Sequence, residues 1–348
     1  MNAPIIAFFN NKGGVGKTSL VYHLTWMYYD LGLRVLAADL DPQANLTAAF
    51  LDEDRLEAIW EQNSESRNTI FECVQPLLSG LGDIAEPQLE TIEDGLSLLV
   101  GDLKLSGFED ELSSQWPDCL DRKERAFRVI SAFWRILDRA GRILPPVNVI
   151  LVDLGPNLGA INRAALIAAD YVVVPLSPDL FSLQGLKNLG PTLKRWRGEW
   201  QERVLKNPAP ATLPLPPGKM DPIGYVILQH GVRFDRPVQA WQRWIERIPA
   251  LYQVELLSAP GDVQAAPAAA EPHRLALLKH YQSLMPMSQE ARKPIFHLKP
   301  ADGVVGAHGL AVQRVRADFR DLARAIATRV GFLESLEDYS SSDVAPER

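Results

Sequence analysis

Residues 5–19 read IIAFFNNKGGVGKTS, an apolar run followed by a glycine-rich turn, a lysine and two hydroxyl residues. The apolar run at 5–9 predicts a buried parallel strand, and a helix is predicted over about 17–29, ended by Gly32. A glycine-rich loop between a strand and a helix is the context of a phosphate-binding loop (P-loop). Its main-chain N–H groups can surround phosphate oxygens, and the start of the helix adds partial positive charge.

In such a loop Lys17 is expected to contact the β- and γ-phosphates, and the Thr18 hydroxyl is expected to bind Mg²⁺. The sequence therefore predicts ATP and Mg²⁺ as ligands and hydrolysis of ATP to ADP and phosphate as the activity. A plain glycine-rich turn is the alternative, and the strand, lysine and hydroxyl together argue against it. The residues expected to bind the nucleotide here are Asn11, Lys12, Gly13, Gly14, Val15, Gly16, Lys17, Thr18 and Ser19.

The loop departs from the usual G-x-x-x-x-G-K-[ST] pattern, because Asn11 stands at the first glycine position and Lys12 follows it. In this respect the sequence resembles the ParA/MinD group of deviant Walker A ATPases, whose loop reads KGGVGKT. The resemblance implies a dimer that forms on ATP binding, in which Lys12 reaches the partner subunit's nucleotide. Its positive charge would act there as an arginine finger does. A solvated loop lysine is the alternative for Lys12.

Two acidic motifs follow predicted strands, at the carboxyl ends where ligands bind in open α/β sheets. The first is DLDPQANL at 39–46, which matches the ParA-type pattern D-x-D-P-Q-[GA]-N. By this resemblance Asp41, the third expected catalytic residue beside Lys12 and Lys17, orients the attacking water. Asp39 is expected to support the Mg²⁺ shell or the geometry of the loop. Aspartates that only shape a turn before Pro42 are the alternative.

The second motif is VILVDLGPNLG at 149–159, an apolar strand that ends in an aspartate. Asp153 is expected to hold Mg²⁺ through a water, as in a Walker B strand. ParA proteins usually continue with C-P-P-S-L-G, so Gly155 and Asn157 depart from that pattern. Gln229, after a strand predicted at 224–228, and residues 175–179 are expected near the base. Ordinary loop residues at strand ends are the alternative.

Further strands are predicted at 34–38, 96–100, 147–152 and 171–174, and further helices at 122–140, 160–169, 182–203 and 310–333. This alternation predicts an α/β fold with a mostly parallel sheet and helices on both faces, as in P-loop NTPases. We expect a single domain at 1–335 with proline-rich insertions at about 207–222 and 259–272. A disordered polar tail is expected at 336–348. The resemblance is strong in the front half and weak in the back half, where 283–300 matches faintly.

The composition is ordinary for a globular protein, with 47% hydrophobic residues and a net charge of −7 among 348 residues. No apolar run approaches the ~20 residues that span a bilayer, and no export signal is recognisable. Cys73 and Cys119 have no metal-ligand spacing, and the six histidines form no HExxH motif. A cytoplasmic location is expected, with nucleoid association if the protein binds DNA.

The resemblance further implies non-specific DNA binding, a ParB-like or cargo-adaptor protein that stimulates hydrolysis, and partition or positioning of a plasmid, chromosome or other cargo. Solvated helix faces are the alternative for each basic cluster. Other functions left open are a MinD-like membrane ATPase, a ligase or reductase of this fold, and a regulatory switch that recruits a protein without DNA. The acidic tail argues against MinD, and the cysteine positions argue against the reductase. The candidate DNA-binding residues are Lys187, Lys194, Arg195, Arg197, Arg233, Arg236, Arg243, Arg247, Arg292, Lys293, Arg314, Arg316, Arg320 and Arg324.

Overall fold

The computed structural model describes residues 3–61, 68–143, 147–228, 238–257, 271–279, 281 and 283–333. Eight strands form one sheet in the order β3-β4-β2-β5-β1-β6-β7-β8, and every pair except β3–β4 is parallel. The predicted mostly parallel α/β fold is therefore confirmed. The strands are β1 (Ile5–Phe8), β2 (Val35–Asp39), β3 (Glu90–Glu93), β4 (Leu96–Leu99), β5 (Val149–Asp153), β6 (Tyr171–Leu176), β7 (Asp221–Leu228) and β8 (Arg274–Leu278).

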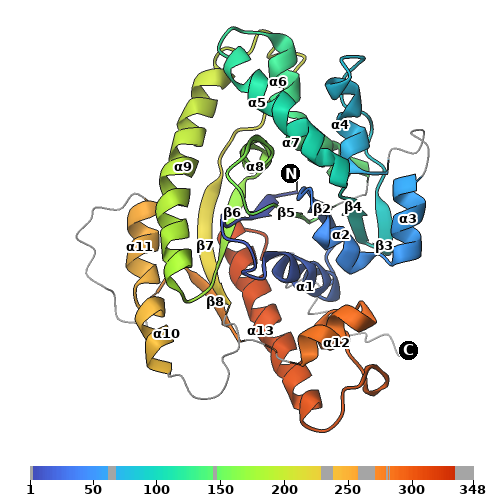
Figure 1. Ribbon diagram of the computed structural model, residues 1–348, viewed down its shortest axis with the longest axis vertical. Helices are drawn as coiled ribbons and strands as arrows, with labels where there is room; N and C mark the ends of the chain where they lie inside the picture. The colour runs from blue at the N-terminus through green and yellow to red at the C-terminus, as the bar shows by residue number, and fades with distance from the viewer. Residues whose placement is uncertain are drawn as a thin grey trace.

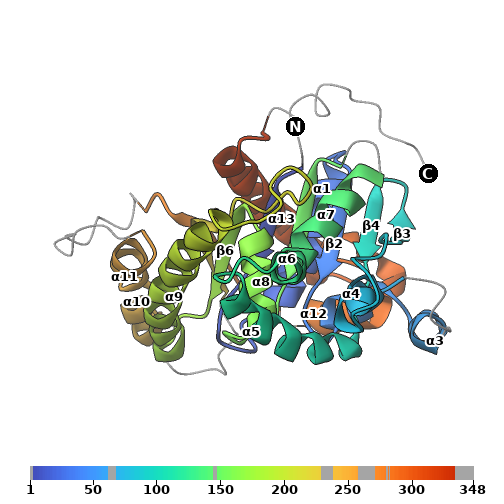
Figure 2. The ribbon, with the colours of Figure 1, turned by 90° about the horizontal axis from the view of Figure 1, so that it is seen from above.

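Helices cover both faces of the sheet, with a separate apolar core on each face. Figure 1 shows α9 and α11 on one side of the molecule, α3 and α4 on the other, and α1 near the centre. The view from above in Figure 2 has the same two groups at opposite sides. One core contains α1 (Lys17–Asp30), α2 (Asn45–Phe50), α3 (Glu53–Glu61), α12 (Leu284–Ala291), η3 (Ile295–His297) and α13 (Ala307–Val330), which η4 (Pro300–Asp302) precedes. The other contains α4 (Ile70–Leu78), η1 (Leu103–Phe108), α5 (Glu109–Asp118), α6 (Glu124–Ile130), α7 (Ala132–Ile143), α8 (Ala160–Ala168), α9 (Leu180–Val204), α10 (Val238–Ile245) and α11 (Ile248–Glu255).

The helix predicted over 122–140 is two helices, α6 and α7, separated at Ser131. The Ser131 hydroxyl donates a 2.6 Å hydrogen bond to the carbonyl oxygen of Phe127, one turn earlier. A serine bond of this kind competes with the helical ladder and bends a helix. The apolar periodicity of the segment continues across the break, which explains why the sequence predicted one helix.

The proline-rich segment 207–222 packs against α9. The indole Nε1 of Trp200 donates to the carbonyl oxygen of Pro216 at 2.9 Å, and Met220 is buried in the core. Strand β7 already begins at Asp221, inside the predicted insertion. Residues 259–270 of the second proline-rich segment, and the tail 336–348, lie outside the described residues.

The order of the central strands brings the predicted motifs to one edge of the sheet. In the parallel ladders Asp153 at the end of β5 lies opposite Asp39 of β2 and Phe8 of β1. The P-loop follows β1 directly, so it lies beside the acidic end of β5, and the acidic end of β2 is one strand further along the sheet. Of the helices that the structure describes, none is both long and apolar enough to cross a membrane.

Candidate nucleotide-binding site

The P-loop curls closely around the start of α1. Gly14 and Gly16 have φ angles of +71° and +84°, in the left-handed region that favours glycine. A Cβ atom on Gly14 would meet nothing within 4 Å, so the space above the loop is open. The free N–H groups at the start of α1 and the N-terminal end of the helix dipole face this space. The loop is thus a cradle suited to an anion.

Lys17 and Thr18 both contact the carboxylate at the end of β5. Lys17 Nζ lies 2.7 Å from Asp153 Oδ1, and Thr18 Oγ1 donates to Asp153 Oδ2 at 2.6 Å. The Lys17 side chain is 7% exposed and the Asp153 side chain is fully buried. A buried charge is tolerated when it is paired and hydrogen-bonded, as both carboxylate oxygens are here. The lysine, hydroxyl and carboxylate predicted from separate motifs therefore meet at one point.

The neighbouring aspartate, Asp39, is occupied in holding the loop that follows β2. Its Oδ2 accepts bonds from the N–H and hydroxyl of Thr47, both at 2.8 Å, and its Oδ1 accepts from the N–H of Asp41 at 3.2 Å. Burial, together with the charge of Asp153, raises the pKa of Asp39 to about 7. Of the two roles expected for Asp39, these contacts favour the shaping of the loop.

Burial also raises the pKa of Asp153, while the ammonium of Lys17 and the hydroxyl of Thr18 oppose that rise. Asp39 and Asp153 occupy the same register position of adjacent strands, so two carboxylates share one buried region. Two neighbouring carboxylates repel each other when both are ionised, and a nearby cation relieves this repulsion. The site is therefore built to attract positive charge.

Asp41 lies on the wall of the cavity above the P-loop and is 5% exposed. Its Oδ1 accepts the N–H of Gln43 at 3.0 Å, and Ala44 has a left-handed φ of 51° in the same turn. The backbone of Gly155 passes close by, because a Cβ atom on Gly155 would lie 3.2 Å from Asp41 Oδ1. The two predicted acidic loops are thus in contact with each other.

Lys12 and Asn11 point toward the start of α9. The ammonium of Lys12 forms an ion pair with Asp179 and lies 5.9 Å from the ring centre of Phe181, although Lys12 also lines the cavity. The Asn11 side chain does not line the cavity, and a Cβ atom on Gly185 would lie 2.9 Å from its Oδ1. Only the main chain of Asn11 remains a candidate for nucleotide contact. Gln229 lies outside the described residues.

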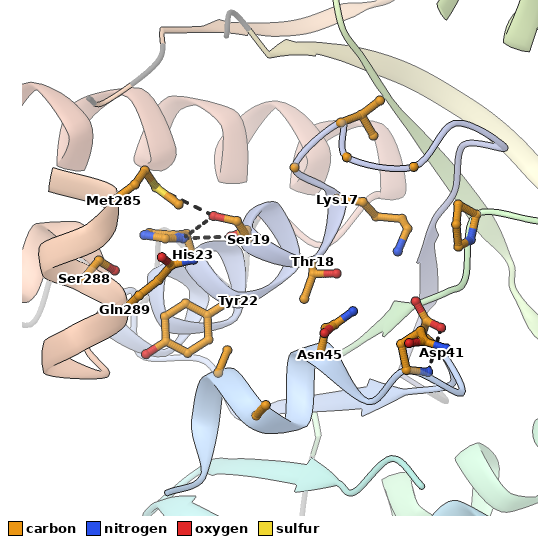
Figure 3. Close-up of a pocket in the computed structure, with 18 of the residues that line it drawn as sticks. Lys17, Thr18, Ser19, Tyr22, His23, Asp41, Asn45, Met285, Ser288 and Gln289 are labelled. Atoms are coloured by element: carbon orange, nitrogen blue, oxygen red, sulfur yellow. Dashed lines mark hydrogen bonds between the residues drawn. The ribbon is translucent and has the colours of Figure 1, made fainter. Parts of the chain in front are cut away.

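A cavity of about 620 Å³ opens above the P-loop, within the range of about 300–1,000 Å³ usual for ligand sites. In Figure 3, Lys17, Thr18, Asn45 and Asp41 face one end of it, and Met285, Ser288 and Gln289 approach the other end from α12. The open cradle, the ammonium and the hydroxyl fit a triphosphate, and the oxygen donors fit Mg²⁺, which prefers oxygen ligands. The lining residues that the sequence did not predict are Tyr22, His23, Gln43, Asn45, Ala48, Ala49, Pro156, Met285, Ser288 and Gln289.

Some of these residues had a recognisable signal in the sequence. Tyr22 and His23 lie one turn beyond Thr18 and Ser19 on α1, so helical spacing from the P-loop could have found them. Asn45 belongs to the motif DLDPQANL. The α12 residues had no local signal, because Met285 approaches Ser19 across a separation of 266 residues.

Comparison with known proteins agrees with this geometry. A family model described as an AAA domain (AAA_31) matches residues 3–206, which include the P-loop and both acidic motifs. The chromosome partitioning protein ParA of Caulobacter vibrioides is 30% identical over 200 residues, 58% of this chain and 66% of that protein. The chain thus spans just under two thirds of the length of that relative.

Two solved structures are similar over nearly the whole chain. Protein DIP2308 of Corynebacterium diphtheriae has a TM-score of 0.68 at 25% identity and covers 94% of this chain and 98% of its own. A variant of Cyanothece McdA in complex with ATP has a TM-score of 0.58 at 14% identity, covers 94% and 97%, and shows the fold alone. With a family model that spans more than half of its residues and a ParA relative matched over the same region, the chain belongs to this AAA-domain family and, within it, to the ParA family.

Proposed function

We propose that this protein binds ATP with Mg²⁺, dimerises face to face around the nucleotide and hydrolyses it slowly to reset the dimer. One observation carries the proposal: Lys17, Thr18, Asp153 and Asp41, from three separate segments, converge at the start of α1. Electrostatic stabilisation by positioned groups is the main source of catalysis in phosphoryl transfer. Cyanothece McdA, which shares this fold, was solved in complex with ATP, and we take ATP as the nucleotide in this proposal.

Each side chain has a part in this proposal. The ammonium of Lys17 would leave Asp153 and bind the β- and γ-phosphates. Thr18 and Asp153 would then hold Mg²⁺. Bound Mg²⁺ would neutralise charge on the transferred phosphoryl group. Asp41 would accept a hydrogen bond from the attacking water and orient it toward the phosphate. Asp39 would keep Asp41 in place by accepting a hydrogen bond from the main-chain N–H of Asp41.

An exposed apolar side chain beside Lys12 supports a dimer in which Lys12 reaches the partner subunit's nucleotide. Phe181 is 71% exposed, and Leu180 and Leu158 are also exposed large apolar residues. Lys12, which lines the cavity, lies beside Phe181. Exposed apolar side chains that gather near a functional site mark interaction surfaces.

We further propose that the ATP-bound dimer binds DNA without sequence preference and positions a plasmid, chromosome or other cargo, with a ParB-like or adaptor protein stimulating hydrolysis. The clearest candidate surface is α13, where Arg316, Arg320 and Arg324 recur at four-residue spacing and are exposed. Arg197 is less suitable, because its guanidinium donates to the carbonyl oxygens of Lys219 and Met220. The net charge of −7 favours the alternative of a regulatory switch that recruits a protein without DNA.

Lys17→Ala should abolish ATP binding, measured with a fluorescent ATP analogue. Lys104, an exposed lysine on η1, provides the matched control: Lys104→Ala should bind as the wild type does. Tight binding retained by Lys17→Ala would refute the P-loop assignment.

Asp41→Ala should bind ATP but turn it over at least about a hundredfold more slowly, since positioned groups in active sites contribute effects of this order. The variant should accumulate as a dimer with ATP, measurable by light scattering. Normal turnover in this variant would remove Asp41 from the mechanism.

A gel shift with ATP at low and moderate salt tests the DNA step. An ATP-dependent shift that weakens steeply with salt is expected, because phosphate contacts release counterions. Absence of any shift at low salt, in a protein that hydrolyses ATP, would favour the regulatory alternative.

A further inference from the structure

The loop after Asp153 is held from within the fold by one side chain, that of Asn162 on the first turn of α8. Asn162 is 1% exposed. Its Nδ2 donates to the carbonyl oxygen of Gly155 at 2.9 Å and to that of Asn157 at 2.6 Å. It also lies 3.0 Å from the side-chain oxygen of Asn157. A single amide group therefore fixes the loop on both sides of Pro156.

The orientation of this amide follows from its partners. Carbonyl oxygens only accept hydrogen bonds, so the NH₂ group of Asn162 must face Gly155 and Asn157. Its Oδ1 has no hydrogen-bond partner among the residues that the structure describes. A buried amide oxygen without a partner is unfavourable, so this oxygen does not help to hold the side chain in place. The three contacts of Nδ2 are the hydrogen bonds that hold it.

The held loop touches two parts of the proposed ATP site. A Cβ atom on Gly155 would lie only 3.2 Å from Asp41 Oδ1, so the Gly155 backbone forms the seat of the Asp41 carboxylate. Pro156 lines the cavity, and a Cβ atom on Gly13 of the P-loop would lie 3.8 Å from its Cγ. A shift of the loop would displace Asp41 and open the cavity wall together.

The usual ParA loop has a second proline in place of Gly155 and a serine in place of Asn157. Proline restricts the backbone by itself, whereas glycine leaves it free. In this chain the three contacts of Asn162 restrict the loop instead. Within the same loop, the N–H of Gly159 donates a further hydrogen bond to Asn157 Oδ1 at 2.9 Å.

We propose that Asn162 is a positioning residue for ATP hydrolysis: it holds the Gly155–Asn157 loop in the shape that seats the Asp41 carboxylate. This inference rests on the proposed function, because it requires Asp41 to act on the attacking water. Asn162 touches neither nucleotide nor water in this role. Its loss should therefore reduce the rate of hydrolysis without reducing ATP binding in proportion.

Asn162→Asp has nearly the same shape but places an oxygen against two carbonyl oxygens. We expect kcat to fall by about tenfold to a hundredfold, because small misplacements of groups at an active site reduce the rate by factors of this order. The Kd for a fluorescent ATP analogue should change by less than about threefold. Asn148→Ala is the matched control, since it removes a side-chain bond to Arg34 N–H at the amino end of β5. It should leave kcat unchanged.

Asn162→Ser replaces Asn162→Asp if the latter does not fold, and Gly155→Ala tests the seat of Asp41 directly. Gly155→Ala should lower kcat in the same way, whereas Gly107→Ala, with open space around its Cβ, should not. A purely structural role would lower Tm and leave kcat per folded molecule unchanged. That result, or a wild-type kcat in a folded Asn162 variant, overturns the inference.

The failure of this inference can be told apart from failure of the proposed function. If the wild type does not hydrolyse ATP, or Asp41→Ala turns over normally, the proposed function itself is wrong. If the wild type is active and Asp41→Ala is slow, while the folded Asn162 variant is fully active, only the positioning role is wrong.

Discussion

His23→Gln should make the stability of the protein less sensitive to acid. His23 is buried on α1, where its Nδ1–H donates to the carbonyl oxygen of Ser19 at 2.7 Å and its Nε2 accepts the N–H of Ile295 at 3.1 Å. The N–H of Ile295 can only donate, so Nε2 carries no proton in the folded state and the ring is neutral. Phe319 stacks on the same ring with centres 5.0 Å apart.

Burial lowers the pKa of His23 from 6.5 to about 4, the nearby His297 acts in the same direction, and the bond to Ser19 opposes them. The unfolded chain takes up the proton near pH 6.5 and the folded protein only near pH 4. Stability from the neutral ring is therefore complete above pH 6.5 and is lost as the pH falls from 6.5 toward 4. The loss amounts to about 1–2 kcal/mol at pH 5.5 and about 2–3 kcal/mol at pH 4.5.

Urea denaturation of the wild type and of His23→Gln at pH 7.5, 5.5 and 4.5 measures this loss. Glutamine does not titrate, so position 23 of the variant loses no stability as the pH falls, and the wild type's advantage over the variant should shrink by the values above. Thr25→Val is a control on the same helix, because it removes the buried bond to the Val21 carbonyl oxygen without removing a titrating group. A difference between wild type and His23→Gln that stays constant across the three pH values would refute the reasoning.

Two further predictions concern contacts that join distant segments. Asp179→Asn should keep the cap of α9, since asparagine and aspartate cap helices equally well, but should release Lys12. ATP-dependent dimers should then form at a lower protein concentration, measured by light scattering, and an unchanged threshold would contradict this. Trp200→Phe should lower the free energy of unfolding by about 1–3 kcal/mol, because the Pro216 carbonyl oxygen loses its donor. Wild-type stability in urea would show that this bond does not anchor 207–222.

The sequence predicted the elements whose signals are local. The strands predicted at 5–9 and 147–152 contain the apolar runs 5–9 and 149–152, and the P-loop combines its glycines, lysine and hydroxyl within nine residues. Once the strands are known to be parallel, the meeting of Lys17 with Asp153 follows from strand order. Fold and phosphate chemistry could therefore be predicted together.

The edges of the sheet were not predicted. Strand β3, Glu90–Glu93, is paired antiparallel with β4 and alternates between half-buried and exposed residues. Its charged sequence lacks the continuous apolar run that marks a central strand. The five residues of β8, Arg274–Leu278, are mostly half-buried, and they pair only with β7 at the other edge. Edge strands depend on their neighbours for pairing more than on their own composition, so a single sequence gives them little signal.

The contacts that decide how the site behaves also come from distant segments. Lys12 and Asp179 both lie in stretches that the sequence analysis singled out, yet their ion pair joins residues 167 positions apart. Asn162 was assigned only to a helix, and its role as a clamp depends on Gly155 and Asn157, two positions that depart from the family pattern. The sequence showed that the loop departs from the family motif, but it did not show that Asn162 contacts the loop at these two positions.

The buried carboxylates give Lys17 a structural role beside its proposed chemical one. Asp39 and Asp153 lie side by side in the sheet, and Lys17 is the cation paired with Asp153 at 2.7 Å. Removing one partner of a buried pair leaves an uncompensated charge, which typically costs about 3–5 kcal/mol. Lys17→Ala should therefore lose stability as well as ATP binding, and Lys17→Ala with Asp153→Asn should recover stability without recovering binding. Such a separation in urea denaturation and ATP titration would show that the two roles belong to the same ammonium group.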